Sequence, residues 1–68
     1  MNCDTVRPGN IVKVRRRGSG FYSALLVERV TARQFIAGGL RFWKENGVEK
    51  KGRILEVFEI ERTNEPID

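Results

Sequence analysis

The sequence predicts an all-β fold, a small five-stranded barrel with tight glycine turns. Short runs of apolar and branched residues are separated by turn-forming residues, and Gly38-Gly39 lies between two such runs. No segment carries a convincing long helical pattern. A chain of 68 residues forms one small domain over residues 1–68. We expect its ends to fray at about residues 1–5 and 63–68.

The first predicted strand covers residues 11–15 and follows a Pro-Gly-Asn turn. Its residues alternate between apolar and basic types, so Val12 and Val14 face inward while Lys13 and Arg15 face outward. A basic loop that contains glycines ends this strand.

The second predicted strand covers residues 21–31, and its apolar residues change parity along the way. Leu26 and Val30 share one face, whereas Leu25 and Val27 share the other. A bulge after Val27 brings Val27 and Val30 to the same side, and it also supplies the bend that a small barrel needs.

Residues 34–37 and 40–44 form a predicted hairpin around Gly38-Gly39, because the central positions of tight hairpin turns favour positive φ. One face of this hairpin carries Phe35, Ala37, Leu40 and Phe42. The opposite face carries Ile36, Arg41 and Trp43.

Residues 54–62 admit two interpretations. Ile54, Phe58 and Ile60 alternate as in a strand, whereas Ile54, Val57, Phe58 and Glu61 also fit a helical stripe. We favour a final strand centred on residues 57–60. The predicted core consists of Val12, Val14, Leu26, Val30, Phe35, Leu40, Phe42 and Ile60.

A meander followed by a returning strand is the order of the SH3-like barrel class, which includes Tudor and KOW modules. Closure of the sheet removes strand edges that would otherwise be open to aggregation. A five-stranded oligonucleotide-binding fold and a sheet capped by a C-terminal helix are the alternatives.

The centre of the chain also carries a recognisable order of segments. Leu26-Val27-Glu28-Arg29-Val30-Thr31, Gln34-Phe35 and Leu40-Arg41-Phe42-Trp43-Lys44 precede Gly47, a basic stretch at 50–53 and a closing strand at 58–60. This pattern resembles small uncharacterised proteins of tailed-bacteriophage genomes. The resemblance implies a phage or prophage origin and a barrel fold, and it implies no function. Trp43, where the pattern has a basic residue, and Gly39 depart from it.

The sequence contains no histidine and one cysteine, Cys3. An internal disulfide is therefore excluded, and we expect no metal site and no cofactor. General acid–base catalysis usually recruits histidine, and Cys3 lies in a terminus without a base partner, so we expect no enzymatic activity. The polar first ten residues lack the apolar segment of a signal peptide. We expect a cytoplasmic location, in the host cell if the protein is phage-encoded.

Positive charge concentrates in residues 1–53, where twelve lysines and arginines face four carboxylates; residues 54–68 carry one arginine and five carboxylates. A basic body attracts polyanions such as nucleic acid. The arginines of loop 15–17 offer forked donors for phosphates, and Trp43 offers a ring on which a base stacks. The predicted binding surface for nucleic acid or another partner consists of Lys13, Arg15, Arg16, Arg17, Tyr22, Arg41, Trp43, Lys44, Lys50 and Lys51.

The predicted function is a small basic barrel that binds nucleic acid, DNA or RNA, through phosphates with little sequence preference. The alternative is a protein-interaction module, such as a phage regulator or inhibitor of a bacterial host protein, with Tyr22 and Trp43 as anchors. A third hypothesis is a structural protein that forms homo-oligomers through a strand edge. No membrane partner is expected, because the longest apolar run, residues 24–27, is far shorter than a bilayer span.

Overall fold

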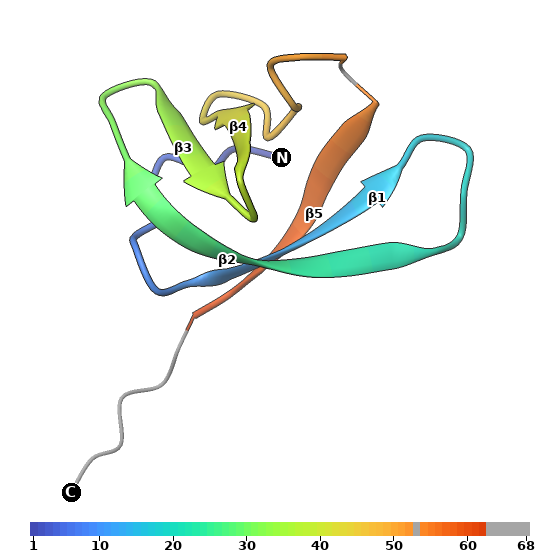
Figure 1. Ribbon diagram of the computed structural model, residues 1–68, viewed down its shortest axis with the longest axis horizontal. Helices are drawn as coiled ribbons and strands as arrows, with labels where there is room; N and C mark the ends of the chain where they lie inside the picture. The colour runs from blue at the N-terminus through green and yellow to red at the C-terminus, as the bar shows by residue number, and fades with distance from the viewer. Residues whose placement is uncertain (53, 63–68) are drawn as a thin grey trace, which may run out of the picture.

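The computed structural model of the protein describes residues 1–52 and 54–62. Five antiparallel strands form one curled sheet in the order β4-β3-β2-β1-β5 (Figure 1). No helix occurs in these described ranges, so the all-β prediction and the final strand are confirmed. The predicted fraying of residues 63–68 falls outside the described residues. The strands are β1 (Ile11–Arg16), β2 (Tyr22–Val30), β3 (Gln34–Ala37), β4 (Leu40–Trp43) and β5 (Leu55–Glu61).

The long strand β2 bends and pairs with a different neighbour in each half (Figure 1). Its register with β3 shifts between Val27 and Arg29, which leaves Glu28 as an extra residue. The predicted bulge is therefore confirmed, and it turns both Val27 and Val30 toward the core. A matching shift between β1 and β5 leaves Phe58 as the extra residue there.

The segment from Gly47 to Lys50 joins the two ends of the curled sheet. On the β4 side, the Lys50 N–H donates to the Arg41 carbonyl at 2.8 Å, and the Trp43 N–H donates to the Val48 carbonyl at 3.0 Å. On the β5 side, the Glu49 N–H donates to the Leu55 carbonyl at 3.0 Å, and the Val57 N–H donates to the Gly47 carbonyl at 2.9 Å. We call residues 47–50 the closing segment, because it bridges the outer strands.

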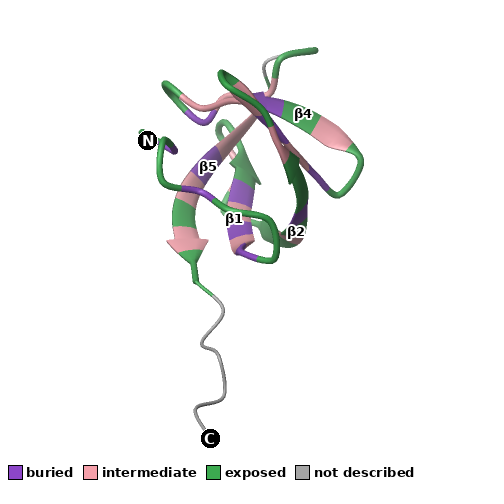
Figure 2. Ribbon diagram, turned by 90° about the vertical axis from the view of Figure 1, so that its left-hand side faces the viewer, coloured by how far each residue is buried: buried purple, intermediate pink, exposed green. Residues whose placement is uncertain are grey.

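The core lies inside the curl, and buried residues alternate with more exposed ones along β1, β4 and β5 (Figure 2). Phe35 and Phe42 are both fully buried, and their rings stack with centroids 5.3 Å apart. Nine apolar side chains are buried, and the sequence predicted an inward orientation for six of them. The full set is Cys3, Val6, Val12, Val14, Val27, Phe35, Ala37, Phe42 and Val57.

The six whose inward orientation the sequence predicted are Val12, Val14, Val27, Phe35, Ala37 and Phe42. Cys3, Val6 and Val57 join them as buried residues that the sequence did not single out.

The predicted core is confirmed in part and wrong at one position. Val12, Val14, Phe35 and Phe42 are buried, and Val30, Leu40 and Ile60 are partly buried and pack against the core. Leu26 is 52% exposed, so its predicted burial is wrong. The register places Val12 opposite Leu25, and neighbours across a strand pair share a face, so Leu25 packs inward in its place.

The N-terminal segment packs against the turn after β4, at residues 44–47, in contrast to the predicted fraying of residues 1–5. Cys3 is fully buried, and its N–H donates to the Lys44 carbonyl at 2.6 Å. The Met1 ammonium donates to the Asn46 carbonyl at 2.9 Å. A free cysteine behaves as a small apolar residue, which explains why a terminus that looks polar in sequence contributes to the core. Over the described residues, the structure contains no helix long and apolar enough to cross a membrane.

Burial raises the pKa of the Cys3 thiol above its ordinary value of 9.0. The folded state therefore favours the neutral thiol, whose contribution to stability is complete below pH 9 and is lost as the pH rises beyond that value. We expect Cys3 to react with iodoacetamide at pH 8 far more slowly in the folded protein than in urea, as measured by mass spectrometry. Equal rates in the two states would show that the thiol is accessible.

Candidate functional site

The structure distributes the predicted site residues over two separate outer surfaces of the sheet. The first surface covers β1, β5 and the first half of β2, and we call it the β1 face. The second covers β3, β4, the closing segment and the second half of β2, and we call it the β4 face. Lys13, Arg15 and Tyr22 lie on the β1 face, whereas Arg41, Trp43 and Lys50 lie on the β4 face.

The cations of the β1 face are matched by carboxylates from β5. The register places Lys13 opposite Glu59 and Arg15 opposite Glu56. The Lys13 ammonium lies 3.7 Å from the Glu59 carboxylate. Carboxylates this close repel phosphates, so the β1 face is a poor site for a polyanion.

Aromatic side chains cover the same cations. The Lys13 ammonium lies 5.7 Å from the centre of the Tyr22 ring, and the Arg15 guanidinium lies 5.1 Å from the centre of the Phe58 ring. The two rings meet edge to face with centroids 5.6 Å apart. The bulge in β5 turns Phe58 outward into this cluster, which accounts for its absence from the core. Tyr22 is therefore part of a local cation–aromatic cluster.

The three arginines of the predicted phosphate loop do not form one cluster. Arg16 is exposed at the end of β1. The Arg17 N–H donates to the Ile54 carbonyl at 3.2 Å, and its guanidinium Nε lies 3.9 Å from the Glu56 carboxylate. Arg17 also borders a hollow beside Trp43 and Glu45, which places it at the edge of the β4 face.

A row of cations crosses the β4 face. Arg29 pairs with Ile36, and Ile36 pairs with Arg41, which places these three side chains side by side across β2, β3 and β4. The hydrogen bond from the Lys50 N–H to the Arg41 carbonyl extends the row onto the closing segment. We call Arg29, Arg41 and Lys50 the cation row. At about 4.8 Å for each strand spacing, the row extends over roughly 14 Å.

Trp43 lies next to the cation row and is half-buried. It pairs with Gln34, whose side-chain carbonyl accepts a hydrogen bond of 3.1 Å from the Arg41 guanidinium. The Lys50 ammonium lies 6.0 Å from the centre of the indole ring. The sheet therefore holds one large aromatic ring beside two cations on an outer surface.

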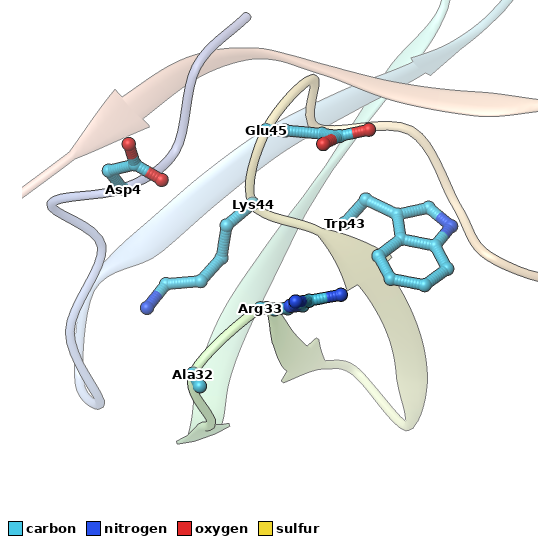
Figure 3. Close-up of a pocket in the computed structure, with 6 residues that line it drawn as sticks. All are labelled: Asp4, Ala32, Arg33, Trp43, Lys44 and Glu45. Carbon is cyan, nitrogen blue, oxygen red and sulfur yellow. The ribbon is translucent and has the colours of Figure 1, made fainter.

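A hollow of about 460 Å³ opens beside Trp43 (Figure 3). The Arg33 guanidinium extends toward the indole side of this hollow, whereas the Lys44 side chain extends away from the indole (Figure 3). The Lys44 ammonium donates to the Thr31 carbonyl at 2.9 Å. Arg33 thus adds a cation to the surroundings of Trp43, and Lys44 is held by the backbone. The hollow is lined by Asp4, Ala32, Arg33, Trp43, Lys44 and Glu45.

The two faces differ in how their cations are compensated. Within residues 1–52 and 54–62, the ion pairs are Lys13–Glu59 and Arg17–Glu56. No carboxylate of the described chain lies within 4.0 Å of a charged nitrogen in the cation row or in Arg33. Lys51 is exposed and borders a hollow of about 430 Å³ that Arg41, Glu49 and Lys50 also line. Among the described residues, the β4 face therefore carries four cations without an ion pair, Arg29, Arg33, Arg41 and Lys50. On the β1 face Arg15 also forms no ion pair within the described ranges, but it lies opposite Glu56 in the register.

Sequence reasoning missed Arg29 and Arg33 as members of this face. The position of Arg29 follows from the bulge at Glu28, which restores the parity of Val27 and Val30 and leaves Arg29 outward. That signal was present in the sequence. Arg33 lies in the turn between β2 and β3, where no alternation of residues indicates the direction of a side chain.

Comparisons with protein-family models, with curated proteins and with solved structures give no match to this chain. The SH3-like assignment and the phage origin therefore stay predictions. The function is argued from the geometry of the β4 face alone.

Proposed function

We propose that the protein binds nucleic acid through the β4 face, with phosphates on the cation row and a base against Trp43. The observation that carries this proposal is the half-buried indole flanked by cations without carboxylate partners. Guanidinium and ammonium groups bind phosphate oxygens, and an aromatic ring accepts any base by stacking. The combination favours binding with little sequence preference, and it favours single strands, whose bases are free to stack.

Binding is a better proposal for this chain than catalysis. The sequence has no histidine. Its one thiol, Cys3, is fully buried, and burial raises its pKa, which lowers the fraction of nucleophilic thiolate. The features that support a ligand site on the β4 face are positive charge and aromatic surface, which bind anions and stack on bases.

Trp43 is the single tryptophan of the chain, so its fluorescence reports directly on the proposed site. We expect a single-stranded oligothymidine to quench this fluorescence at low salt. The affinity should fall as salt rises, because bound phosphates release counterions. Absence of any binding at low salt, by fluorescence and by gel shift, would refute the proposed function.

Replacing Arg29, Arg41 and Lys50 together by alanine should make the slope of log affinity against log salt shallower by roughly 2, since each lost single-strand phosphate contact contributes about 0.7. The matched control replaces Lys13, Arg15 and Arg16 by alanine, which removes the same charge from the β1 face and its loop. We expect the control to retain most of the parent slope. A larger effect of the control would move the interface to the β1 face.

Trp43→Ala should weaken single-strand binding by about 1–3 kcal/mol and leave the salt slope nearly unchanged, because stacking releases no counterions. A labelled oligonucleotide measures this by fluorescence anisotropy. Unchanged affinity in a folded Trp43→Ala protein would exclude base stacking at this ring.

A protein partner, such as a bacterial host protein, is the second candidate for the same face. Tryptophan and arginine dominate protein hot spots, and Trp43 lies beside Arg41. Such a contact should change little with salt, whereas binding through phosphates should weaken steeply. The salt series therefore separates the two functions.

A further inference from the structure

The first half of β2 has an open edge. Strand β1 pairs with one side of β2 from Tyr22 to Leu26, but β3 pairs with the other side only from Val27 onward. The β1–β2 hairpin extends away from β3 and β4, so none of the described strands lies along this edge (Figure 1). Residues 22–25 therefore form the exposed border of the sheet.

The hydrogen-bond pattern shows which backbone groups face the open edge. The Val27 N–H donates to the Asn10 carbonyl at 2.8 Å, so odd-numbered residues of this half direct their N–H and C=O groups to β1. Even-numbered residues direct theirs away, which places the groups of Tyr22 and Ala24 on the open edge. The Gly38 N–H donates to the Leu26 carbonyl at 3.2 Å, so the open edge ends at Leu26.

This edge lacks the protection that the other two edges of the sheet possess. The closing segment covers β4 and part of β5, and the remainder of β5 carries Glu59 and Glu61. Residues 21–27 contain no charge and no proline. Natural proteins usually guard a free edge with charges, proline or a covering segment. An unguarded edge of this kind indicates a strand partner.

Large apolar side chains beside the edge are also exposed. Phe21 is 86% exposed, Tyr22 is 58% exposed, and Leu26 is 52% exposed. A small domain gains stability by covering side chains of this size, since burial of apolar area stabilises by about 25 cal/mol per Å². The unpaired backbone groups and the exposed side chains lie along the same few residues.

We propose that a second copy of this chain covers the edge, with the two β2 strands antiparallel about a two-fold axis near Ser23. Tyr22 then lies opposite Ala24 of the partner subunit, and Phe21 lies opposite Leu25 of the partner subunit. An uncharged segment pairs with itself without like-charge repulsion, and a two-fold axis makes both halves of the contact identical. The pairing joins two five-stranded sheets into one continuous sheet. It is independent of nucleic-acid binding on the β4 face.

The contact involves few residues, so we expect a weak dimer with a dissociation constant in the micromolar range or above. Sedimentation equilibrium over concentrations from about 10 µM to 1 mM measures it directly. Monomers at every concentration would overturn the proposal.

Ala24→Lys should raise the dimer dissociation constant by roughly tenfold or more, because it places like charges close together near the two-fold axis. Ala24 is exposed on the outer surface of β2 and lies opposite Lys13, so circular dichroism first verifies that the variant keeps the fold. The matched control is Ala32→Lys, which adds the same charge at an exposed turn residue outside the edge. If both variants change the dimer dissociation constant equally, or if neither changes it, the contact lies elsewhere.

A cross-link tests the same axis without adding charge. Antiparallel neighbours in a non-hydrogen-bonded pair lie about 4.5 Å apart between Cα atoms, which is within disulfide range. Ser23→Cys should therefore form a covalent dimer with oxidised glutathione, whereas Ala32→Cys should not. The native Cys3 is fully buried and should stay unlinked in both. Absence of a Ser23→Cys dimer together with monomeric sedimentation would refute the pairing.

Discussion

Replacing Phe42 by alanine should lower the free energy of unfolding by about 3–5 kcal/mol. The Phe42 side chain is fully buried and stacks on Phe35, so its removal leaves a cavity at the centre of the curl. This loss approaches the whole stability of a domain this small, because native proteins are stable by only about 5–15 kcal/mol. Urea unfolding followed by circular dichroism measures the effect.

Phe21→Ala is the matched control, since it removes the same side chain from a position that is 86% exposed. We expect the control to change the free energy of unfolding by less than about 0.5 kcal/mol at concentrations where the protein is monomeric. Similar losses in both variants would show that burial at Phe42 does not determine the stability of the fold.

Gly47→Ala should lower the free energy of unfolding by about 2–4 kcal/mol, through backbone strain and steric overlap together. Gly47 has a φ of 71°, which side chains rarely adopt. An added Cβ would lie 3.0 Å from the Met1 carbonyl oxygen, 3.1 Å from the Val57 Cβ and 3.3 Å from the Cys3 Sγ. Two of these neighbours belong to the packed core and cannot move aside freely.

Gly39→Ala separates the two contributions. Gly39 also has a positive φ, of 80°, but an added Cβ there would meet nothing within 4 Å. We expect this control to show the conformational cost alone, about 1–2 kcal/mol. Thermal melting of both variants gives the comparison, and equal losses would contradict a steric contribution at Gly47.

The strands could be predicted because their signals are local. Alternation identifies β1, the paired glycines identify the β3–β4 hairpin, and the parity change in β2 indicates the bulge. The burial of Leu26 was predicted wrongly because residues 23–27 are all apolar or small, so alternation does not indicate which of them face inward. Only the register with β1, which pairs Val12 with Leu25, decides which leucine faces inward.

The candidate site could be predicted only in its residue types. The sequence assigned Arg41, Trp43 and Lys50 to one surface together with Lys13 and Arg15. The hairpin and the closing segment bring the first three together, whereas Lys13 and Arg15 lie on the other face. The sequence does not indicate that Lys13 lies opposite Glu59, because these residues are far apart along the chain. Whether a cation has a carboxylate beside it depends on such long-range strand pairing. The β1 face has carboxylates of β5 beside its cations, and this distinguishes it from the β4 face.

The order of strand pairing has a consequence for how the chain folds. Strands β2, β3 and β4 pair through short turns, whereas β1 pairs with β5 across most of the sequence, with Ile11 opposite Glu61. Contacts between distant residues require closure of a long loop, which slows their formation. We therefore expect the meander that carries Trp43 to form early and the β1–β5 pairing to form last. In a stopped-flow refolding experiment, the change in Trp43 fluorescence should then occur before the Val57 amide becomes protected from hydrogen exchange.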